Sequence, residues 1–358
     1  MGAAAAYYLA RRGVAVTVIE RTGVACAASG KSGGFLALDW CDNSPVGPLA
    51  RLSFALHAEL PGELSADYGY RRMDTYMLAA RERGVVTGGH RMPAAPAWID
   101  GPAVVAGRLG SAETTAQVHP ALFTTALLNA ARGRGAELRM GVVECVAPRD
   151  GRGASVAVDG ETLEADAIVL AMGPWTARVR GVALPRIHGL KGYSVTLAAA
   201  GVPAHALFMD YRLADGRALE PEIMPRPDGT VYVCGMADPQ PLPASADGVE
   251  VSEAGCAILA GAAGRVSAAL AAAPIERRQA CYRPVTDDGV PLIGRVPGSP
   301  RIYVATGHGP WGMLNAPGTG LALAELIVDG ATRSLDLGPF DPMRLTAGGR
   351  RAQGGPRA

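Results

Sequence analysis

The chain has 358 residues, of which 49% are hydrophobic and 19% are charged, and its formal net charge is +1. These values are typical of a folded globular protein with a large core, and they give no reason to expect nucleic acid or an anionic membrane as a partner. No apolar run reaches the length of about 18 residues that a membrane span needs. The six cysteines form no Cys-x-x-Cys pair, so we expect reduced thiols and no metal site.

The first twenty residues follow the pattern of a nucleotide-binding unit. Small residues over 2–12 predict a helix, and Gly13 stands where a helix ends. Residues 14–19 form an unbroken apolar run, typical of a strand buried on both faces, and Glu20 follows at its carboxyl end. Helix, strand and acid make up the second half of a dinucleotide-binding βαβ unit. In that unit Gly2 would allow close helix–strand packing, and Glu20 would bind ribose hydroxyls.

The same start predicts that the first strand of this unit is missing. In a dinucleotide-binding unit, a strand and a Gly-x-Gly-x-x turn precede the third glycine. We therefore expect the upstream codons to encode that strand and turn before Gly2, and without them the chain should bind a dinucleotide poorly. A targeting segment would be lost with them, so either a cytoplasmic or an organellar location is expected.

Further pieces of the nucleotide-binding pattern follow along the chain. A long loop of Gly, Ser and Ala comes after Glu20, and loops of this length are usually functional. Apolar periodicity and turn residues predict helices over 49–68 and 120–132, strands over 137–146, 154–158 and 167–172, and turns at 150–151 and 159–160.

The pattern changes between about residues 180 and 281. Short alternating strands, a hairpin turn at 227–229 and an Ala-rich helix over 252–272 predict an antiparallel sheet with an attached helix. Beyond residue 300, a strand, a Gly-rich turn and a helix return. The sequence therefore predicts an α/β fold, α+β overall, in which a Rossmann-like nucleotide-binding domain carries an inserted antiparallel-sheet substrate domain.

These patterns also give expected domain boundaries. The nucleotide-binding domain is expected to be discontinuous and the second domain to cap it. The expected ranges are 1–48, 115–179 and 283–345 for the nucleotide-binding domain, 49–114 and 180–282 for the substrate or cap domain, and 346–358 for a disordered tail.

Three stretches together resemble a known family: AVTVIERTGVACAASGKSGGFLALDW, ADAIVLAMGPWT, and the block from CYRPVTDDG to LALAELI. They resemble the D-amino-acid-oxidase-like FAD-dependent oxidoreductases, the superfamily of glycine oxidase and sarcosine oxidase, over nearly the whole chain. Within that superfamily, ASGKSGGFLALDWCD and GHGPWGMLNAPGTG are most similar to a eukaryotic subgroup of oxidoreductases. The yeast representative of that subgroup is linked to endosomal recycling, and its substrate is unsettled.

The resemblance implies a bound FAD. Glu20 would bind the adenosine ribose, and Val143 would offer backbone contacts to the adenine. Glycines suit the rest of the site because backbone N–H groups must come close to phosphates and ring edges. The residues that the resemblance places beside the pyrophosphate and the flavin are Ser29, Gly30, Lys31, Ser32, Gly33, Gly34, Gly173, Gly307, His308, Gly309, Trp311, Gly312 and Met313.

Arg283 and Lys31 are the catalytic residues that the resemblance implies. Arg283 would hold a substrate carboxylate, because a guanidinium meets a carboxylate with two parallel hydrogen bonds. Its alternative role is a structural salt bridge with Asp287 or Asp288. Lys31 would approach the flavin and help to activate oxygen, and its alternative is an ordinary loop lysine paired with Asp39.

Other residues near these motifs have two interpretations each. Cys281 stands where sarcosine oxidases carry the cysteine that is linked to flavin, but a buried free thiol and noncovalent FAD are favoured. His308 would contact the cofactor, or else cap its own loop. Tyr193, Tyr232 and Trp311 would line the substrate pocket, or else belong to the core.

The expected activity is oxidation of a small amine or amino-acid-like substrate, with or without a carboxylate, by hydride transfer to flavin with oxygen as acceptor. The alternative is a flavin-binding or degenerate scaffold protein in membrane trafficking with little catalysis. A NAD-dependent dehydrogenase would share only the βαβ unit, and the C-terminal block argues against it.

Overall fold

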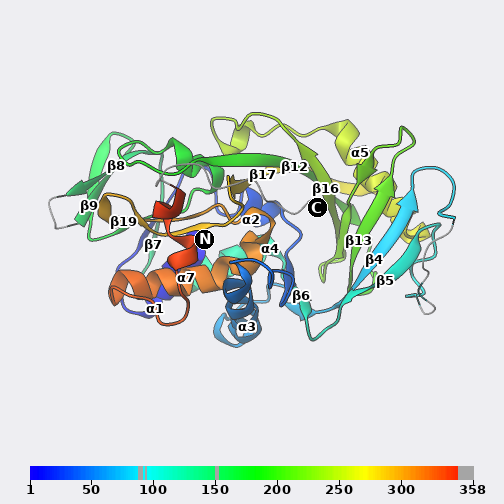
Figure 1. Cartoon of the computed structure of the whole chain (residues 1–358), viewed down its shortest axis with the longest axis horizontal. Helices are drawn as coiled ribbons and strands as arrows, with labels where there is room; N and C mark the ends of the chain where they lie inside the picture. Colours follow the sequence, from blue (N-terminus) through cyan, green and yellow to red (C-terminus); the bar gives the residue numbers. More distant parts are fainter. Residues whose placement is uncertain (88–91, 93–94, 150–152, 346–358) are drawn as a thin grey trace.

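The computed structural model describes residues 1–87, 92, 95–149 and 153–345. Two bodies lie side by side, one with most of the helices and several small sheets, the other built on one large sheet (Figure 1). The helices are α1 (Gly2–Arg11), α2 (Ala28–Lys31), α3 (Gly47–Glu63), α4 (Pro120–Arg132), α5 (Glu253–Gly264), α6 (Ala268–Ala272) and α7 (Gly312–Val328), with 3-10 turns at Gly173–Arg178, Ala246–Gly248, Gly309–Trp311, Gly338–Phe340 and Pro342–Leu345.

Within the described residues, the strands form five sheets. They are β1 (Thr17–Glu20), β2 (Phe35–Ala37), β3 (Arg71–Arg72), β4 (Asp74–Arg81), β5 (Val104–Gly110), β6 (Thr115–Gln117), β7 (Glu137–Met140), β8 (Val143–Arg149), β9 (Gly153–Val158), β10 (Glu161–Ala165), β11 (Ile168–Leu170), β12 (Ile187–Ala198), β13 (His205–Arg212), β14 (Ala218–Leu219), β15 (Glu222–Pro225), β16 (Thr230–Asp238), β17 (Ile275–Thr286), β18 (Leu292–Val296) and β19 (Ser299–Thr306). The expected fold class, a nucleotide-binding α/β part joined to a largely antiparallel sheet, is confirmed.

The helical body contains short parallel strands between two layers. β1 pairs in parallel with β7, and β11 pairs in parallel with β19. Val18 of β1 and Val169 of β11 pack toward the helices, whereas Ile19 and Ile168 pack toward the β8–β9–β10 sheet. The two strands therefore belong to one layer, although no hydrogen bond between described residues joins them.

Small residues bring α1 close to α7. A Cβ added to Gly320 of α7 would lie 2.6 Å from the backbone carbon of Ala4, so only glycine permits this approach. The expected helix over 2–12 ends one residue earlier in the structure, and Gly13 follows with a φ of +74°. The left-handed conformation of Gly13 turns the chain into β1.

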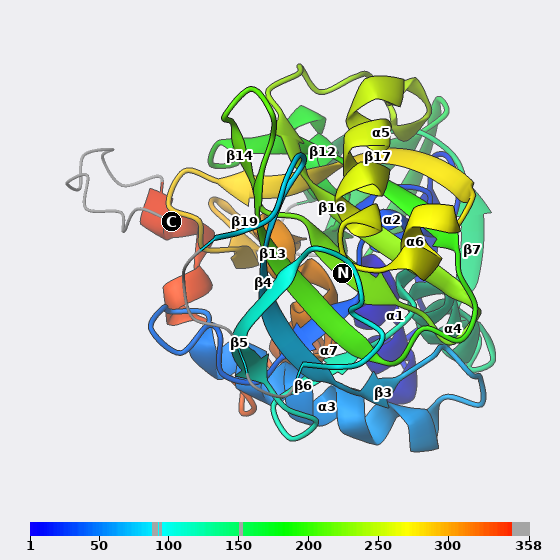
Figure 2. The same ribbon diagram turned by 90° about the vertical axis from the view of Figure 1, so that its right-hand side faces the viewer.

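The large sheet has the strand order β17-β12-β16-β15-β13-β4-β5, with β14 paired to β13. Helices α5 and α6 cover its outer face, toward the viewer in Figure 2. Side chains on alternate positions pack beneath them, among them Val231 and Val233 of β16 and Ala280 of β17. The opposite side, which we call the inner face, carries Met224 and Tyr232.

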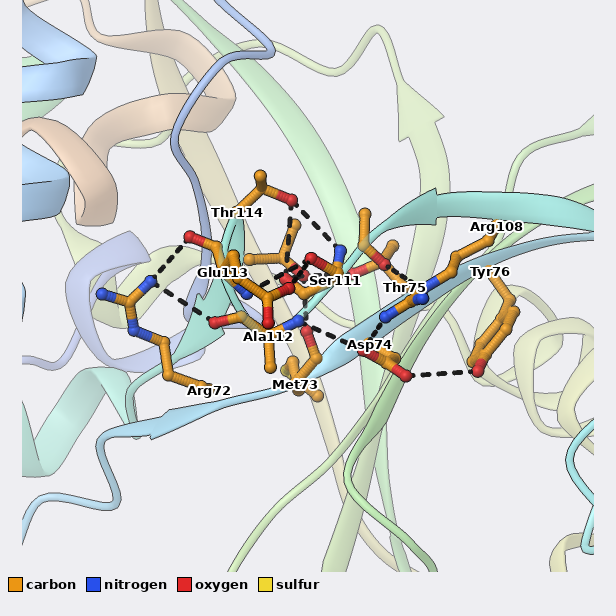
Figure 3. Close-up of polar contacts among 12 residues, drawn as sticks. Arg72, Met73, Asp74, Thr75, Tyr76, Arg108, Ser111, Ala112, Glu113 and Thr114 are labelled. Carbon is orange, nitrogen blue, oxygen red and sulfur yellow. Dashed lines mark hydrogen bonds and ion pairs between the residues drawn. The ribbon is translucent and has the colours of Figure 1, made fainter.

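A polar network fixes the corner where the chain passes from β3 of the small β2–β6–β3 sheet into β4 of the large sheet (Figure 3). The carboxylate of Asp74 accepts hydrogen bonds from Arg108 at 2.6 Å and from the backbone N–H of Ala112 at 3.1 Å. Thr75 donates to the hydroxyl of Thr115 at 2.9 Å, and both threonines are fully buried. The Thr75–Thr115 bond satisfies hydroxyl groups that would otherwise be buried unpaired.

Several predicted elements match closely. The helix expected over 120–132 is α4, and the turn expected at 159–160 has a positive φ at both residues. The Ala-rich helix expected over 252–272 is instead two helices, because Ser267 caps a new one by accepting a hydrogen bond from the N–H of Ala269. The turn expected at 150–151 and the tail expected at 346–358 lie outside the described residues.

The packing differs from two expected domain boundaries. Helix α3 was expected in the cap domain, yet its buried residues Leu49, Phe54 and Leu60 join the core of α1, α4 and α7. Arg283 was expected in the nucleotide-binding domain, yet it lies on β17, a strand of the large sheet. Among the described residues, no helix is long and apolar enough to cross a membrane.

Candidate functional site

The Gly/Ser loop at residues 29–34 lies between the two bodies and is held by both, at the position of α2 in Figure 1. From the inner face, the hydroxyl of Tyr232 donates to the carbonyl of Lys31 at 2.9 Å, and Arg226 donates to the carbonyl of Ser32 at 2.9 Å. From α4, the hydroxyl of Thr124 donates to the carbonyl of Ser29 at 3.2 Å. The loop is therefore fixed in place by side chains that come from distant parts of the chain.

The glycines of this loop are also required by its packing. A Cβ on Gly30 would lie 1.9 Å from the carbonyl oxygen of Ala25. Gly34 has a φ of +76°, and a Cβ there would lie 1.9 Å from the carbonyl oxygen of Val118. Contacts within the protein thus exclude any other residue at these two positions, in addition to the cofactor contact that the sequence predicts.

Glu20 and the first residues of β8 come together at one end of β1. The Oε1 atom of Glu20 accepts hydrogen bonds from the N–H groups of Thr22, at 2.9 Å, and Gly23, at 3.3 Å. The N–H of Gly141 donates to the Glu20 carbonyl at 2.9 Å, which brings Val143 to the same end of the strand. No described residue donates to Oε2 of Glu20, so this oxygen is available to a ribose hydroxyl.

Three of the predicted glycines meet at the ends of β11 and β19. Gly173 and Gly307 follow these strands with φ values of +56° and +79°. The hydroxyl of Thr306 donates to the carbonyl of Gly173 at 2.8 Å and so ties the two turns together. Gly2 lies beside them, because a Cβ on Gly2 would lie 3.6 Å from the Cβ of Ala171.

His308 is part of the next turn, and its side chain is buried. Its Nε2 atom forms a hydrogen bond with the hydroxyl of Thr319 in α7 at 3.1 Å. Burial lowers the pKa of His308 to about 3, so the ring is neutral near pH 7. Gly309 and Trp311 then lead into α7, which begins with Gly312 and Met313 and has no side-chain cap at its N-terminus. The N-terminus of α7 therefore offers free N–H groups and partial positive charge.

A second buried histidine supports this helix start and was not predicted. Nε2 of His57, in α3, donates to the carbonyls of Met313 at 3.1 Å and Leu314 at 3.2 Å. Burial lowers the pKa of His57 to about 4. In the sequence, a single histidine within an amphipathic helix gave no sign of this contact.

Orphaned polar atoms test whether these stretches fit a polar cofactor. Buried polar atoms are nearly always hydrogen-bonded. Yet Ser32 Oγ, Thr176 Oγ1 and both amide atoms of Asn315 are among the buried polar atoms of the described residues that have no hydrogen-bond partner; others, such as Gln117 Nε2 and Arg265 Nε, lie in other parts of the chain. The first three side chains lie in the 29–34 loop, in the turn after Gly173 and in the first turn of α7, which are the stretches predicted to hold FAD. The arrangement therefore fits a ligand rich in phosphate, hydroxyl and ring polar groups.

Arg283 and Cys281 project to the inner face of the large sheet. Side chains alternate between the two faces along β17, and Ala280, directly before Cys281, packs on the outer face. Arg283 has no hydrogen bond and no ion pair within 4.0 Å among the described residues. The two carboxylates considered as its partners pair with other residues. Asp287 lies 3.9 Å from Arg186 and 3.8 Å from His188. Asp288 forms an ion pair with Arg344 at 2.8 Å. The structural salt bridge considered for Arg283 is therefore wrong.

Lys31 reaches the same sheet. Its Nζ atom donates to the carbonyl of Ala280 at 3.3 Å, and no described contact joins it to Asp39, which corrects the alternative pairing. Burial raises the pKa of the Cys281 thiol, although the charges of Lys31 and Arg283 partly oppose this effect. Lys31, Cys281 and Arg283 thus share one side of β17.

Of the three aromatic residues expected in the pocket, Tyr232 and Trp311 lie near the site and Tyr193 does not. Tyr193 packs in the core between the outer face of the large sheet and helices α5 and α6, and its hydroxyl donates a hydrogen bond to Asp238. The ring of Trp311 packs against that of Trp40, with ring centroids 6.2 Å apart. The inner face also carries Glu222 and Phe208, which sequence reasoning missed. Their only signal was the alternation of residues along two short strands.

Comparisons of the whole chain with known proteins identify its family. The family model described as "FAD dependent oxidoreductase" matches residues 1–326. The "Putative oxidoreductase C1F5.03c" of Schizosaccharomyces pombe is 34% identical over 351 residues, which cover 91% of this chain and 90% of that protein. The "Putative oxidoreductase TDA3" of Saccharomyces cerevisiae is 33% identical over 275 residues, covering 65% of this chain and 52% of that protein.

Solved structures give the same fold. Glycine oxidase from Geobacillus kaustophilus superposes with a TM-score of 0.77 and 26% identity, covering 96% of this chain and 95% of that one. NikD, an amino acid oxidase of nikkomycin biosynthesis, superposes with a TM-score of 0.76 and 18% identity, covering 95% and 94% of the two chains. With the family model matching most of its length, the chain belongs to the D-amino-acid-oxidase-like family of FAD-dependent oxidoreductases.

Proposed function

We propose that this protein oxidises a small amine or amino-acid-like substrate that bears a carboxylate, with FAD held noncovalently and oxygen as the electron acceptor. One observation carries the proposal. Arg283 is a half-buried guanidinium on the inner face with no ion pair among the described residues, on the strand whose Ala280 carbonyl is bonded by Lys31 of the loop expected to hold the flavin. A partly desolvated guanidinium without a counter-ion is a strong site for a substrate carboxylate.

One relative supports the same substrate class. The solved structure that shares 26% of its residues with this chain is a glycine oxidase, whose substrate is an amino acid with no side chain. The structures below 25% identity support the fold only, so the substrate class rests on that one relative and on Arg283.

Each side chain has a definite task in this proposal. Bound FAD supplies the acceptor for the hydride that leaves the substrate carbon. Arg283 binds and orients the carboxylate with two parallel hydrogen bonds. Lys31 brings a positive charge to the same side of β17, and the start of α7 adds the partial charge of a helix N-terminus. Neutral His308 holds the Gly307 turn against α7 and carries no charge into the site.

Two measurements test the proposal. Full-length protein mixed with FAD should show flavin absorbance after gel filtration, and a panel of amines and amino acids of both hands should bleach it without air and release peroxide with air. Arg283→Ala should raise KM for carboxylate-bearing substrates by the equivalent of about 2–5 kcal/mol, whereas Arg278→Ala, an exposed arginine of the same strand, should not.

The two possible failures have different meanings. A protein that takes up FAD but oxidises no member of the panel would leave only the scaffold alternative with bound flavin. An unchanged KM in Arg283→Ala, with activity present, would remove Arg283 from the substrate site but not the oxidase activity.

A further inference from the structure

Three strands of the large sheet place one row of side chains across its inner face. Phe208 of β13 pairs with Glu222 of β15, and Glu222 pairs in turn with Cys234 of β16. Directly opposed residues of antiparallel strands have neighbouring side chains on the same face. Met224 and Tyr232, on the same strands, lie on this inner face as well. Glu222 therefore stands in the middle of the row, between an aromatic ring and a thiol.

Glu222 is poorly satisfied by the protein around it. Its only described hydrogen bond comes from the Sγ atom of Cys234 at 3.6 Å, and a thiol is a weak donor. It has no ion pair within 4.0 Å among the described residues. Glu222 keeps some exposed surface, yet it lies deep enough that desolvation raises its pKa, while the charge of Arg283 lowers it. The carboxylate of Glu222 therefore has no cationic partner among the described residues.

Aromatic rings lie on the other side of the carboxylate. Phe208 contacts Phe35 and Trp40, with ring centroids 5.1 and 4.9 Å apart. Trp40 in turn meets Trp311, in the turn that precedes α7, at 6.2 Å. All four rings keep part of their surface exposed. An ammonium group is attracted both by a carboxylate and by the faces of aromatic rings.

Arg283 completes the arrangement. It projects from β17 to the same face, close enough for its charge to act on Glu222 but not within 4.0 Å of it. The inner face thus presents one positive and one negative side chain, Arg283 and Glu222, that do not form an ion pair with each other. A zwitterion could bind between them, with its carboxylate on Arg283 and its amino group on Glu222 and the rings.

We propose that Glu222 is the subsite for the amino group of the substrate, and that Glu222 and Arg283 together select a zwitterionic amino acid over a simple carboxylic acid or a simple amine. This inference rests on the proposed function, because it assigns the second half of the same substrate. Glu222 acts here as a binding residue, and Phe208 covers one side of the ion pair that it makes. The apolar surface of the rings also favours an amino acid with an apolar side chain or N-substituent.

The test compares matched ligand pairs that differ by the amino group alone: acetate with glycine, propionate with each enantiomer of alanine, and phenylacetate with each enantiomer of phenylglycine. Binding is measured by calorimetry and by the shift in melting temperature, with and without added FAD, so that no turnover is needed. Wild-type protein should bind at least one amino acid about tenfold or more tightly than its matched acid. Glu222→Gln should abolish that preference, whereas Glu220→Gln, an exposed glutamate two residues away, should retain it.

Other outcomes would overturn the inference. Equal binding of acid and amino acid by the wild type would do so without any variant. If Glu222→Gln tightens the acids and leaves the amino-acid preference intact, Glu222 is only a distant counter-charge of Arg283. Glu222→Asp, which keeps the charge, should retain part of the preference and serves if the Gln variant folds poorly. If no ligand of the panel binds and Arg283→Ala changes nothing, the proposed function itself fails, which is a different result.

Discussion

The hydroxyl of Tyr232 donates a hydrogen bond to the backbone carbonyl of Lys31 across 2.9 Å and 201 residues of chain. The contact joins the inner face of the large sheet to the loop that the resemblance places beside the cofactor. A Cβ on Gly33 would lie 3.2 Å from the same tyrosine ring, so the ring packs against the loop as well as bonding to it.

Tyr232→Phe should therefore weaken the attachment of the 29–34 loop to the sheet while keeping the packing of the ring. The variant keeps the ring but leaves the Lys31 carbonyl without its donor, which should lower the free energy of unfolding by about 1 kcal/mol. FAD should bind more weakly, as measured by the quenching of flavin fluorescence on titration. Tyr193→Phe is the matched control, because it removes a hydroxyl hydrogen bond on the outer side of the same sheet. Equal FAD affinity in the two variants would contradict the role given to Tyr232.

Replacing Gly34 by alanine should be far more disruptive than its size suggests. The added Cβ would meet the Val118 carbonyl at 1.9 Å, and the backbone has a φ of +76°. Together these should cost at least about 2 kcal/mol of folding free energy, seen as a lower denaturant midpoint. Gly62→Ala is the control, because Gly62 lies in α3 with nothing within 4 Å of a new Cβ. That change should be neutral or stabilising by up to about 1 kcal/mol.

Stability should fall as the solution becomes mildly acidic. The pKa of His57 is lowered to about 4 by burial, from an ordinary value of 6.5, so the unfolded chain binds the proton more readily than the folded one. The contribution of His57 is complete above pH 6.5 and is lost progressively as pH falls toward 4. Between pH 7 and pH 5 this amounts to about 2 kcal/mol, and His308, whose pKa is lowered further, acts in the same direction.

His57→Gln should flatten that pH dependence. Glutamine can still donate to the Met313 carbonyl but does not titrate in this range. Chemical denaturation at pH 7 and pH 5 should show a smaller difference in unfolding free energy for the variant than for the wild type. His188→Gln, at an exposed position, should leave the difference as it is. A variant with the full wild-type pH dependence would show that His57 is not its source.

Cys281 should remain a free thiol after FAD binds. Burial raises the pKa of this thiol, so little thiolate is present to attack the flavin. Denaturing the FAD-loaded protein in acid should release all of the yellow colour to the supernatant, and Cys281→Ser should behave in the same way. A yellow pellet that disappears in the serine variant would establish a covalent link.

Much of the fold could be predicted because its signals are local. Proline at the start and glycine at the end define α4, and a glycine with positive φ ends α1. The position of α3 could not be predicted in this way, since its amphipathic pattern shows that one face is buried but not against which partner. Only the packed structure places it on α7.

The residues of the candidate site also fall into those that local sequence motifs reveal and those that only strand pairing brings together. The glycine-rich stretches and Arg283 carry recognisable motifs, so they could be listed from the sequence. Glu222 and Phe208 could not, because they become neighbours only through the register of β13 and β15, which no local pattern specifies. The contact of Trp40 with Trp311 likewise joins residues far apart in the chain.

The anchoring of the 29–34 loop has a thermodynamic consequence. Tyr232 and Arg226 hold the loop from the sheet whose inner face is proposed to take the substrate, so that sheet and the cofactor loop share one set of hydrogen bonds. A ligand that stiffens this shared structure lowers the entropy that the second ligand must lose on binding. By linkage, whatever factor FAD applies to the dissociation constant of an amino acid, that amino acid must apply to the dissociation constant of FAD. We expect each ligand to lower the dissociation constant of the other, so both factors should be equal and below one, and both should move toward one in Tyr232→Phe.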